Sequence, residues 1–142
     1  MERKKINIPD IQKKKREGKK ITLLTAYDYP SGRLIDEAGV DIILIGDSLA
    51  MTVLGYESTV PVTMDEMVHH SKAAKRGVKY ALMVGDMPFM TYNIGDKETV
   101  RNAGRFIKEG GCGAVKIEGG TEMTGTVKAL VGGKGVCLKP GQ

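Results

Sequence analysis

Residues 41–48 read Asp-Ile-Ile-Leu-Ile-Gly-Asp-Ser, an apolar run that ends in a glycine and an acid. An unbroken run of β-prone apolar residues is typical of a strand that is buried on both faces, as in a parallel sheet. Similar runs occupy residues 21–26, 80–84 and 114–117, and a weaker one occupies residues 135–138. The chain is therefore predicted to contain four strands and a candidate fifth.

Helical patterns separate these runs. Gly39 follows one of them and is a residue type that commonly ends helices, while Thr63 and Glu66 have the spacing of a capping box at a helix start. The expected helices cover residues 30–38, 64–76, 97–109 and 122–131. Strands that alternate with helices predict an α/β fold with a parallel sheet, either doubly wound or a (β/α)8 barrel.

The length of 142 residues bears on the choice of architecture. A (β/α)8 barrel has eight strands over typically ~250 residues, so four to five strands correspond to about its first half. We expect residues 21–142 to form the first four to five βα units of an incomplete barrel. Half a barrel exposes two strand edges and the apolar flanks beside them.

The net charge of +5 belongs to one end of the chain. Residues 1–20 carry nine Lys or Arg against three Asp or Glu, whereas residues 21–142 are nearly neutral. A basic arm for nucleic acid or membrane is one interpretation, and a solvated first helix held by Ile8 and Ile11 is the other. Because no aromatic residue interleaves these lysines, we favour the helix, with no nucleic-acid and no membrane partner.

Composition excludes several classes of protein. The chain is 41% hydrophobic and 27% charged, which argues against wholesale disorder. Its apolar runs are far shorter than the ~20 residues that span a bilayer, and no apolar signal region follows the basic start. Cys112 and Cys137 have neither CxxC spacing nor a flanking histidine, which argues against a zinc site or a disulfide framework. A cytoplasmic protein is expected.

Three strand-like runs end in an acid beside a glycine. These acids are Asp47, Asp86 and Glu118. Because the carboxyl ends of parallel strands share one face of the fold, the three carboxylates should converge. Each could instead cap the following helix, but three in consecutive βα units favour a site for a hard cation, Mg²⁺ before Zn²⁺. Lys116 should lie on the same rim, where it could bind an anionic substrate.

Two of these turns also resemble each other. Gly46-Asp47-x-x-x-Met51-Thr52 recurs as Gly85-Asp86-x-x-x-Met90-Thr91, which suggests two similar strand-loop units. His69 and His70 fall on the expected second helix, away from the rim, where structural or exposed roles are expected.

Four ordered motifs carry a resemblance to a known family. They are Thr25-Ala26-Tyr27-Asp28-Tyr29, Ile45-Gly46-Asp47-Ser48-Leu49, Asp86-Met87-Pro88-Phe89 and Lys116-Ile117-Glu118-Gly119-Gly120. With them, and over residues 8–120, the chain resembles ketopantoate hydroxymethyltransferase, also called 3-methyl-2-oxobutanoate hydroxymethyltransferase.

The resemblance implies a (β/α)8 barrel that assembles into a homo-oligomer, a decamer in many members. It implies transfer of a hydroxymethyl group from 5,10-methylenetetrahydrofolate to 3-methyl-2-oxobutanoate, which gives 2-dehydropantoate for pantothenate biosynthesis. The family's metal ligands fall on Asp47, Asp86 and Glu118, and its substrate contacts fall on Asp47, Ser48, Asp86 and Lys116.

The chain departs from the family pattern at two places. Ala50 stands where the family usually has glycine, so the backbone would be strained there if it needed a positive φ. The family's catalytic glutamate base lies beyond residue 142, so no catalytic residue is assigned. The chain is expected to carry the metal- and substrate-binding half of the site and to be inactive alone.

Two alternatives remain open at this level. One is a non-catalytic Mg²⁺-binding half-barrel that pairs with a complementary chain. The other is a different Mg²⁺-dependent α-keto acid enzyme, of the phosphoenolpyruvate mutase and isocitrate lyase type. The Thr-Ala-Tyr-Asp-Tyr and Asp-Met-Pro-Phe motifs argue against the second.

Overall fold

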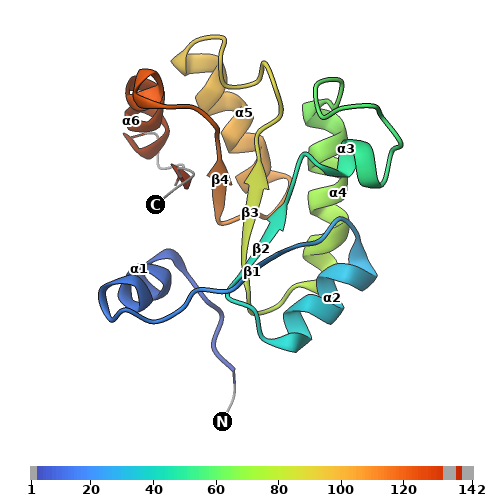
Figure 1. Ribbon diagram of the computed structural model, residues 1–142, viewed down its shortest axis with the longest axis vertical. Coiled ribbons are helices and arrows are strands. Elements are labelled where there is room, and N and C mark those ends of the chain that lie inside the picture. The colour runs from blue at the N-terminus through green and yellow to red at the C-terminus, as the bar shows by residue number, and fades with distance from the viewer. Residues whose placement is uncertain (1–2, 133–136, 139–142) are drawn as a thin grey trace.

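The computed structural model describes residues 3–132 and the backbone of residues 137–138. A single sheet of five parallel strands has the order β1-β2-β3-β4-β5 (Figure 1). The strands are β1 (Leu23–Thr25), β2 (Ile42–Ile45), β3 (Leu82–Asp86), β4 (Ala114–Lys116) and β5 (Cys137–Leu138). A doubly wound sheet reverses its strand order at a switch point, whereas a barrel adds each strand beside the last. The observed order therefore confirms the barrel-type α/β prediction.

Helices connect the successive strands and flank the sheet. They are α1 (Ile8–Arg16), α2 (Tyr29–Ala38), α3 (Leu49–Thr52), α4 (Met64–Gly77), α5 (Asp96–Lys108), the 3₁₀ turn η1 (Thr121–Met123) and α6 (Thr124–Gly132). The predicted capping box starts α4: Glu66 N–H donates to Thr63 Oγ1 at 3.2 Å, and Thr63 N–H donates to Glu66 Oε2 at 2.8 Å. Gly39 ends α2 with a left-handed φ of 93°.

The outer face of the sheet packs against α2, α4 and α5. Ile43, Ile45 and Met83 point to this side and are almost fully buried. Phe106 of α5 lies directly against Gly85, where an added Cβ would come within 2.2 Å of the Phe106 ring. Glycine at position 85 thus lets α5 approach the strand that carries Asp86.

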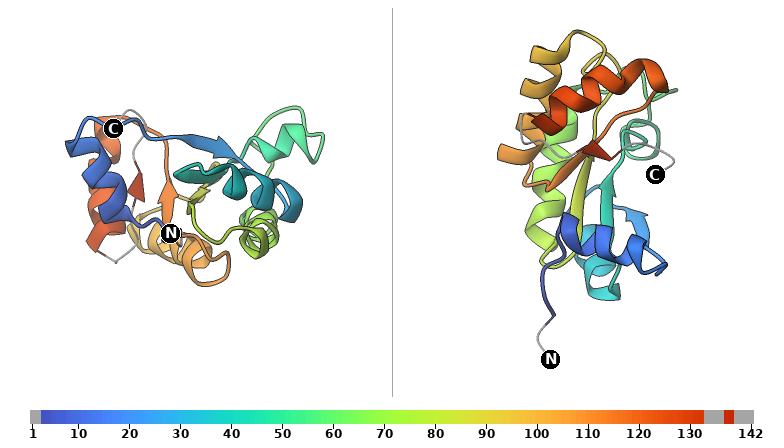
Figure 2. Two further views of the ribbon diagram at one scale, coloured as in Figure 1. Left: turned by 90° about the horizontal axis from the view of Figure 1, so that it is seen from below. Right: turned by 90° about the vertical axis from the view of Figure 1, so that its left-hand side faces the viewer.

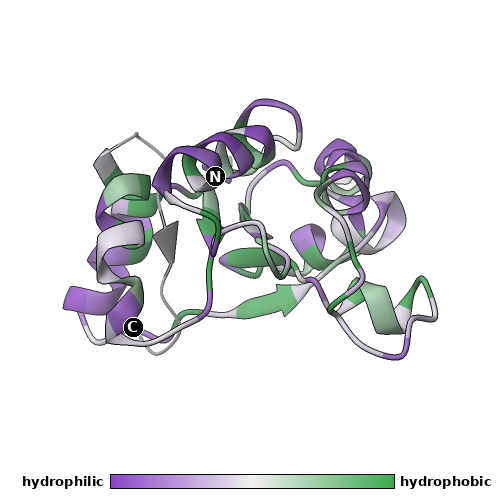
Figure 3. Ribbon diagram, turned by 90° about the horizontal axis from the view of Figure 1, so that it is seen from above, coloured by the Kyte–Doolittle hydropathy of each residue, from purple (hydrophilic) through white to green (hydrophobic). Residues whose placement is uncertain are grey.

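The inner face is apolar at the amino ends of the strands. Ile42, Leu82, Val84 and Ala114 form one cluster there with Ile11 of α1. The helix α1 lies on the opposite side of the sheet from α2 and α4 (Figures 1 and 2). Figure 3 shows the resulting distribution, with hydrophobic strands between helices whose other faces are hydrophilic. The expected first helix is thus packed against the sheet through Ile11.

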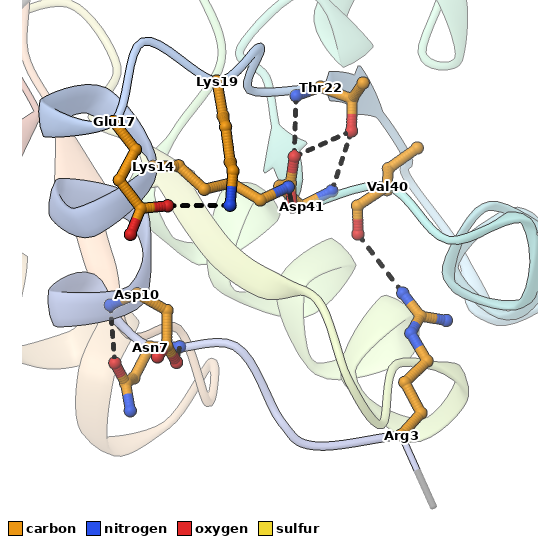
Figure 4. Close-up of polar contacts among 9 residues, drawn as sticks. All are labelled: Arg3, Asn7, Asp10, Lys14, Glu17, Lys19, Thr22, Val40 and Asp41. Carbon is orange, nitrogen blue, oxygen red and sulfur yellow. Dashed lines mark hydrogen bonds and ion pairs between the residues drawn. The ribbon is translucent and has the colours of Figure 1, made fainter. Parts of the chain in front are cut away.

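Polar contacts fix α1 and the segment before it (Figure 4). Lys14 Nζ lies 2.5 Å from Asp41 Oδ1, and Asp41 also accepts from Thr22 N–H at 2.9 Å and from the Thr22 hydroxyl at 3.1 Å. Arg3 donates to the Val40 carbonyl at 3.4 Å, and its guanidinium lies over the Tyr80 ring at 4.9 Å from the centroid. Lys14 therefore serves to dock the basic segment.

Several predictions of detail were wrong. The run expected to form the third strand starts at residue 80, but the strand begins at Leu82 and ends at Asp86. The Gly-Asp repeat is not a structural repeat, because Ile45 pairs with Gly85 and the two aspartates are offset by one position. The short helix α3 was not predicted, and it places Ala50 in a helix. In the described part of the chain, Met90 is the one non-glycine residue with a positive φ, so the strain anticipated at Ala50 does not occur.

Two expectations concern the ends of the sheet. Leu23 and Leu24 on β1 are 46% and 51% exposed, as expected for an apolar edge strand. The expected fifth strand covers residues 135–138, of which 135–136 lie outside the described residues.

Across residues 3–132 and 137–138, no helix combines the length and apolar character needed to cross a bilayer.

Candidate active site at the carboxyl ends of the strands

Three charged side chains meet at the carboxyl ends of neighbouring strands. Asp86 is the last residue of β3 and pairs in register with Lys116, the last residue of β4. Asp47 follows β2 after Gly46. Because side chains alternate along a strand, Asp86 and Lys116 point to the same inner side as Val84 and Ala114. The predicted convergence is therefore present for Asp47 and Asp86, and Lys116 lies on the same rim, as expected.

Lys116 bridges two carboxylates. Its Nζ lies 2.7 Å from Asp86 Oδ1 and 2.9 Å from Glu118 Oε1. The Asp86 side chain is 5% exposed, whereas that of Glu118 is 66% exposed. Burial disfavours the ammonium, but the bonds to Asp86 and Glu118 outweigh it and raise the pKa of Lys116. Lys116 is thus held as a cation at the rim.

Asp47 is the residue of this group whose charged form is disfavoured by its surroundings. Its N–H donates to Asp86 Oδ2 at 3.3 Å, which holds the two residues together. Burial first, and then the negative charge of Asp86, raise the pKa of the Asp47 carboxyl to about 6, against the opposing effect of Lys116. Two neighbouring carboxylates repel each other, and a cation placed between them relieves this repulsion.

Ser48 is positioned by residues from two other elements. The Tyr27 hydroxyl, just after β1, lies 2.8 Å from Ser48 Oγ. The Tyr27 carbonyl lies 2.6 Å from His70 Nδ1 on α4. Sequence reasoning gave Tyr27 and His70 no role in the site. The sequence places Tyr27 in a motif and His70 on a helix. It does not show their contacts, because these depend on how α4 packs against the loop after β1.

Glu118 does not join the aspartates in one cluster. Among residues 3–132, no three or more His, Cys, Asp or Glu side chains lie together in a way that could hold a metal ion. Glu118 instead bonds Lys116. Mg²⁺ commonly takes one or two protein carboxylates and completes its shell with water and substrate oxygens. The pair of Asp47 and Asp86 fits such a site, and Glu118 adjoins it through Lys116.

An aromatic and apolar segment flanks the charged group. Tyr92 lies near Glu118, and burial first, then the charge of Glu118, raise the pKa of its hydroxyl. Phe89 and Met90 precede it and are about half exposed.

A cavity of about 320 Å³ lies elsewhere, between α2 and α4, and its lining includes Arg33, Arg76 and Tyr80 but none of the rim residues.

Comparison with known proteins bears on this arrangement. The sequence profile described as ketopantoate hydroxymethyltransferase matches residues 5–137. The chain belongs to the ketopantoate hydroxymethyltransferase family. The match extends over α1 and strands β1 to β4 and reaches the first residue of β5, so it covers the rim and the elements that position it.

Curated relatives carry the corresponding name. The chain is 62% identical over 117 residues to the 3-methyl-2-oxobutanoate hydroxymethyltransferase of Acetivibrio thermocellus, a match that covers 82% of this chain and 41% of the relative. It is 56% identical over 128 residues to that of Heliobacterium modesticaldum, with 90% and 46% covered. The chain therefore spans less than half the length of these two ketopantoate hydroxymethyltransferase relatives.

Solved structures with the same fold come from other enzymes. A phosphonopyruvate hydrolase has a TM-score of 0.73 at 14% identity, with 87% of this chain and 48% of that chain covered. A 2,3-dimethylmalate lyase, described as a member of the phosphoenolpyruvate mutase and isocitrate lyase superfamily, has a TM-score of 0.61 at 18% identity, with 84% and 46% covered. At these identities the likeness concerns the fold, so it gives no support to the alternative function.

Proposed function

We propose that this chain supplies the magnesium- and substrate-binding part of a 3-methyl-2-oxobutanoate hydroxymethyltransferase. The reaction transfers a hydroxymethyl group from 5,10-methylenetetrahydrofolate to 3-methyl-2-oxobutanoate and gives 2-dehydropantoate. The observation that carries the proposal is the meeting of Asp47, Asp86 and Lys116 at the strand ends. The strength of the family match supports the choice of reaction.

In this proposal each residue at the rim has a distinct task. Asp47 and Asp86 hold Mg²⁺, with Glu118 as a further ligand or as the partner of Lys116. The Lys116 ammonium neutralises the substrate carboxylate, and the Ser48 hydroxyl, oriented by Tyr27, donates to a substrate oxygen. When bound, the cation polarises the keto group and stabilises the negative charge that develops as a proton leaves the branched carbon.

The catalytic base, the location of the protein and its assembly are also part of this proposal. The base that removes the proton is a glutamate in the part of the relatives that this chain does not cover. We also propose a cytoplasmic location and assembly into a homo-oligomer, as in the many family members that form decamers. A second half of the barrel would pair with the exposed edge strand β1.

Complementation tests this proposal. The chain is co-expressed with the part of the Acetivibrio thermocellus relative that it does not match, and 2-dehydropantoate formation is measured with Mg²⁺. We expect turnover that Asp86→Asn lowers by at least ~100-fold, since the substitution removes a buried ligand charge. The exposed Asp65 on α4 gives the matched control, and Asp65→Asn should leave turnover unchanged. Equal activity of the Asp86 variant and the wild type would exclude the proposed site.

A further inference from the structure

The contacts of Asp86 limit what else can bind to it. Lys116 Nζ lies 2.7 Å from Oδ1, and the Asp47 N–H donates to Oδ2 at 3.3 Å. Lys116 also engages Glu118 Oε1 at 2.9 Å. One ammonium therefore contacts two of the three carboxylates that are candidates for holding a divalent cation.

The geometry points to an exchange of cations. We propose that Lys116 and a divalent cation compete for the oxygens of Asp86 and Glu118, so that binding of the cation releases the Lys116 ammonium toward the carboxylate of an anionic substrate. The inference rests on the proposed function, because it takes Mg²⁺ and an α-keto acid as the ligands.

Burial and reach make this exchange possible. Because the Asp86 side chain is almost fully buried, little space remains around its carboxylate, and the Lys116 ammonium and a divalent cation must compete for the same oxygen. Glu118 is exposed and can turn away with little loss of packing. The Lys116 side chain is 22% exposed and has four rotatable methylene groups, so its ammonium can move while its backbone stays paired in β4.

The exchange has a thermodynamic consequence. Lys116 weakens cation binding while it occupies Asp86, and it strengthens anion binding once it is released. By linkage, each ligand then raises the affinity for the other. A lysine that only stabilised the fold would not affect the two ligands in opposite directions.

The first experiment titrates Mn²⁺, as a spectroscopic substitute for Mg²⁺, into the 142-residue chain. Three variants are compared with the wild type by electron paramagnetic resonance: Lys116→Met, Lys116→Arg and Lys97→Met. Lys97 is an exposed lysine in the first turn of α5, so Lys97→Met makes the same change in net charge. We expect Lys116→Met to bind Mn²⁺ ~10-fold more tightly, since a charge-assisted bond to Asp86 no longer competes.

The other variants separate competition from net charge. Lys97→Met should bind Mn²⁺ like the wild type, and Lys116→Arg should bind it no more tightly, because a guanidinium also engages carboxylates. With Mn²⁺ saturating, Lys116→Met should bind 3-methyl-2-oxobutanoate more weakly than the wild type. Equal Mn²⁺ affinity in all four proteins overturns the exchange and leaves the proposed site intact. Failure of all four to bind Mn²⁺ overturns both.

A second measurement needs no variant. Reductive methylation of the wild-type chain with formaldehyde and a borane is followed residue by residue by mass spectrometry, with and without Mg²⁺. Release from Asp86 and Glu118 should increase the modification rate of Lys116 several-fold while that of Lys97 stays constant. An unchanged rate at Lys116 under Mg²⁺ concentrations that saturate the site contradicts the inference.

Discussion

Carboxylates lie at both ends of the sheet, and their partners differ. At the amino end, Asp36 accepts N–H bonds from the backbone of residues 79–81 at 2.7–3.2 Å, and Asp41 is bonded by Lys14 and Thr22. At the carboxyl end, Asp47 faces another carboxylate and its pKa is raised to about 6. The first arrangement stabilises the fold, whereas the second stores repulsion that a ligand can relieve.

The pKa values of Asp41 and Asp47 are shifted in opposite directions. Burial pushes it upward, but hydrogen bonds from Lys14 and Thr22 outweigh burial and lower it. Asp41 is therefore ionised and satisfied by groups of the protein itself. Asp47 lacks comparable donors to its carboxylate in the contacts found for it, and its main charged neighbour has the same sign.

The largest effect is expected at Asp36. Asp36→Ala leaves three N–H groups between α4 and β3 without their acceptor, which should lower the free energy of unfolding by about 3 kcal/mol. Urea denaturation followed by circular dichroism measures the loss. The neighbouring Glu37 is exposed and pairs only with Arg33 among the described ion pairs, so Glu37→Ala should change stability by less than about 0.5 kcal/mol. If both variants lost a similar free energy of unfolding, the structural role inferred for the amino-end carboxylates would be wrong.

Lys14→Met tests the second amino-end carboxylate. Asp41 loses its charged partner but keeps Thr22, and Lys14 is partly exposed, so we expect a loss of about 1.5 kcal/mol at pH 7. Because the pKa of Asp41 is lowered in the fold, its contribution is present above the unfolded value and disappears as pH falls through the folded value. The difference from the wild type should therefore shrink in acid. A constant difference at all pH values would indicate lost packing of Lys14 instead.

Asp47→Asn should have the opposite sign. A carboxyl whose pKa rises from 3.8 to about 6 on folding binds more protons in the folded state between these values, so wild-type stability falls as pH rises through this window. The full shift would correspond to about 3 kcal/mol, but Asp47 is only half-buried, and screening reduces our expectation to about 1 kcal/mol. The variant should be more stable than the wild type at pH 7.5 and equal to it below pH ~4. Thermal unfolding across pH without added metal measures this, and a destabilised variant at pH 7.5 would contradict the contrast between the two ends.

How far the sequence anticipates this contrast depends on the kind of feature. The strand-end acids and the parallel sheet were predictable, because apolar runs and the positions that follow them are local properties. The reason why Asp86 points inward was not predictable, since the apolar run does not show that the strand continues through Gly85 to Asp86. The bridging position of Lys116 was also missed, because it depends on the register between β3 and β4.

The smallest effect is expected at Tyr27. Tyr27→Phe removes the hydroxyl that orients Ser48 and leaves the ring in place, so stability should fall by only about 0.5 kcal/mol. Binding of 3-methyl-2-oxobutanoate in the presence of Mg²⁺, measured by calorimetry, should weaken several-fold. The matched control is Tyr80→Phe at the amino end, which should leave binding unchanged. If both tyrosine variants bind the keto acid alike, Ser48 is not positioned through Tyr27.

The isoleucine-rich packing beneath the rim has an electrostatic consequence. Ile11 of α1 joins Ile42 and Leu82 in an apolar layer that closes the inner face below Asp86 and Lys116. Charges above such a layer are poorly screened from below, so their field extends mainly through the open, watery side. Through Ile11, the basic helix α1 thus contributes an apolar residue to the layer that shapes the field of the charged rim.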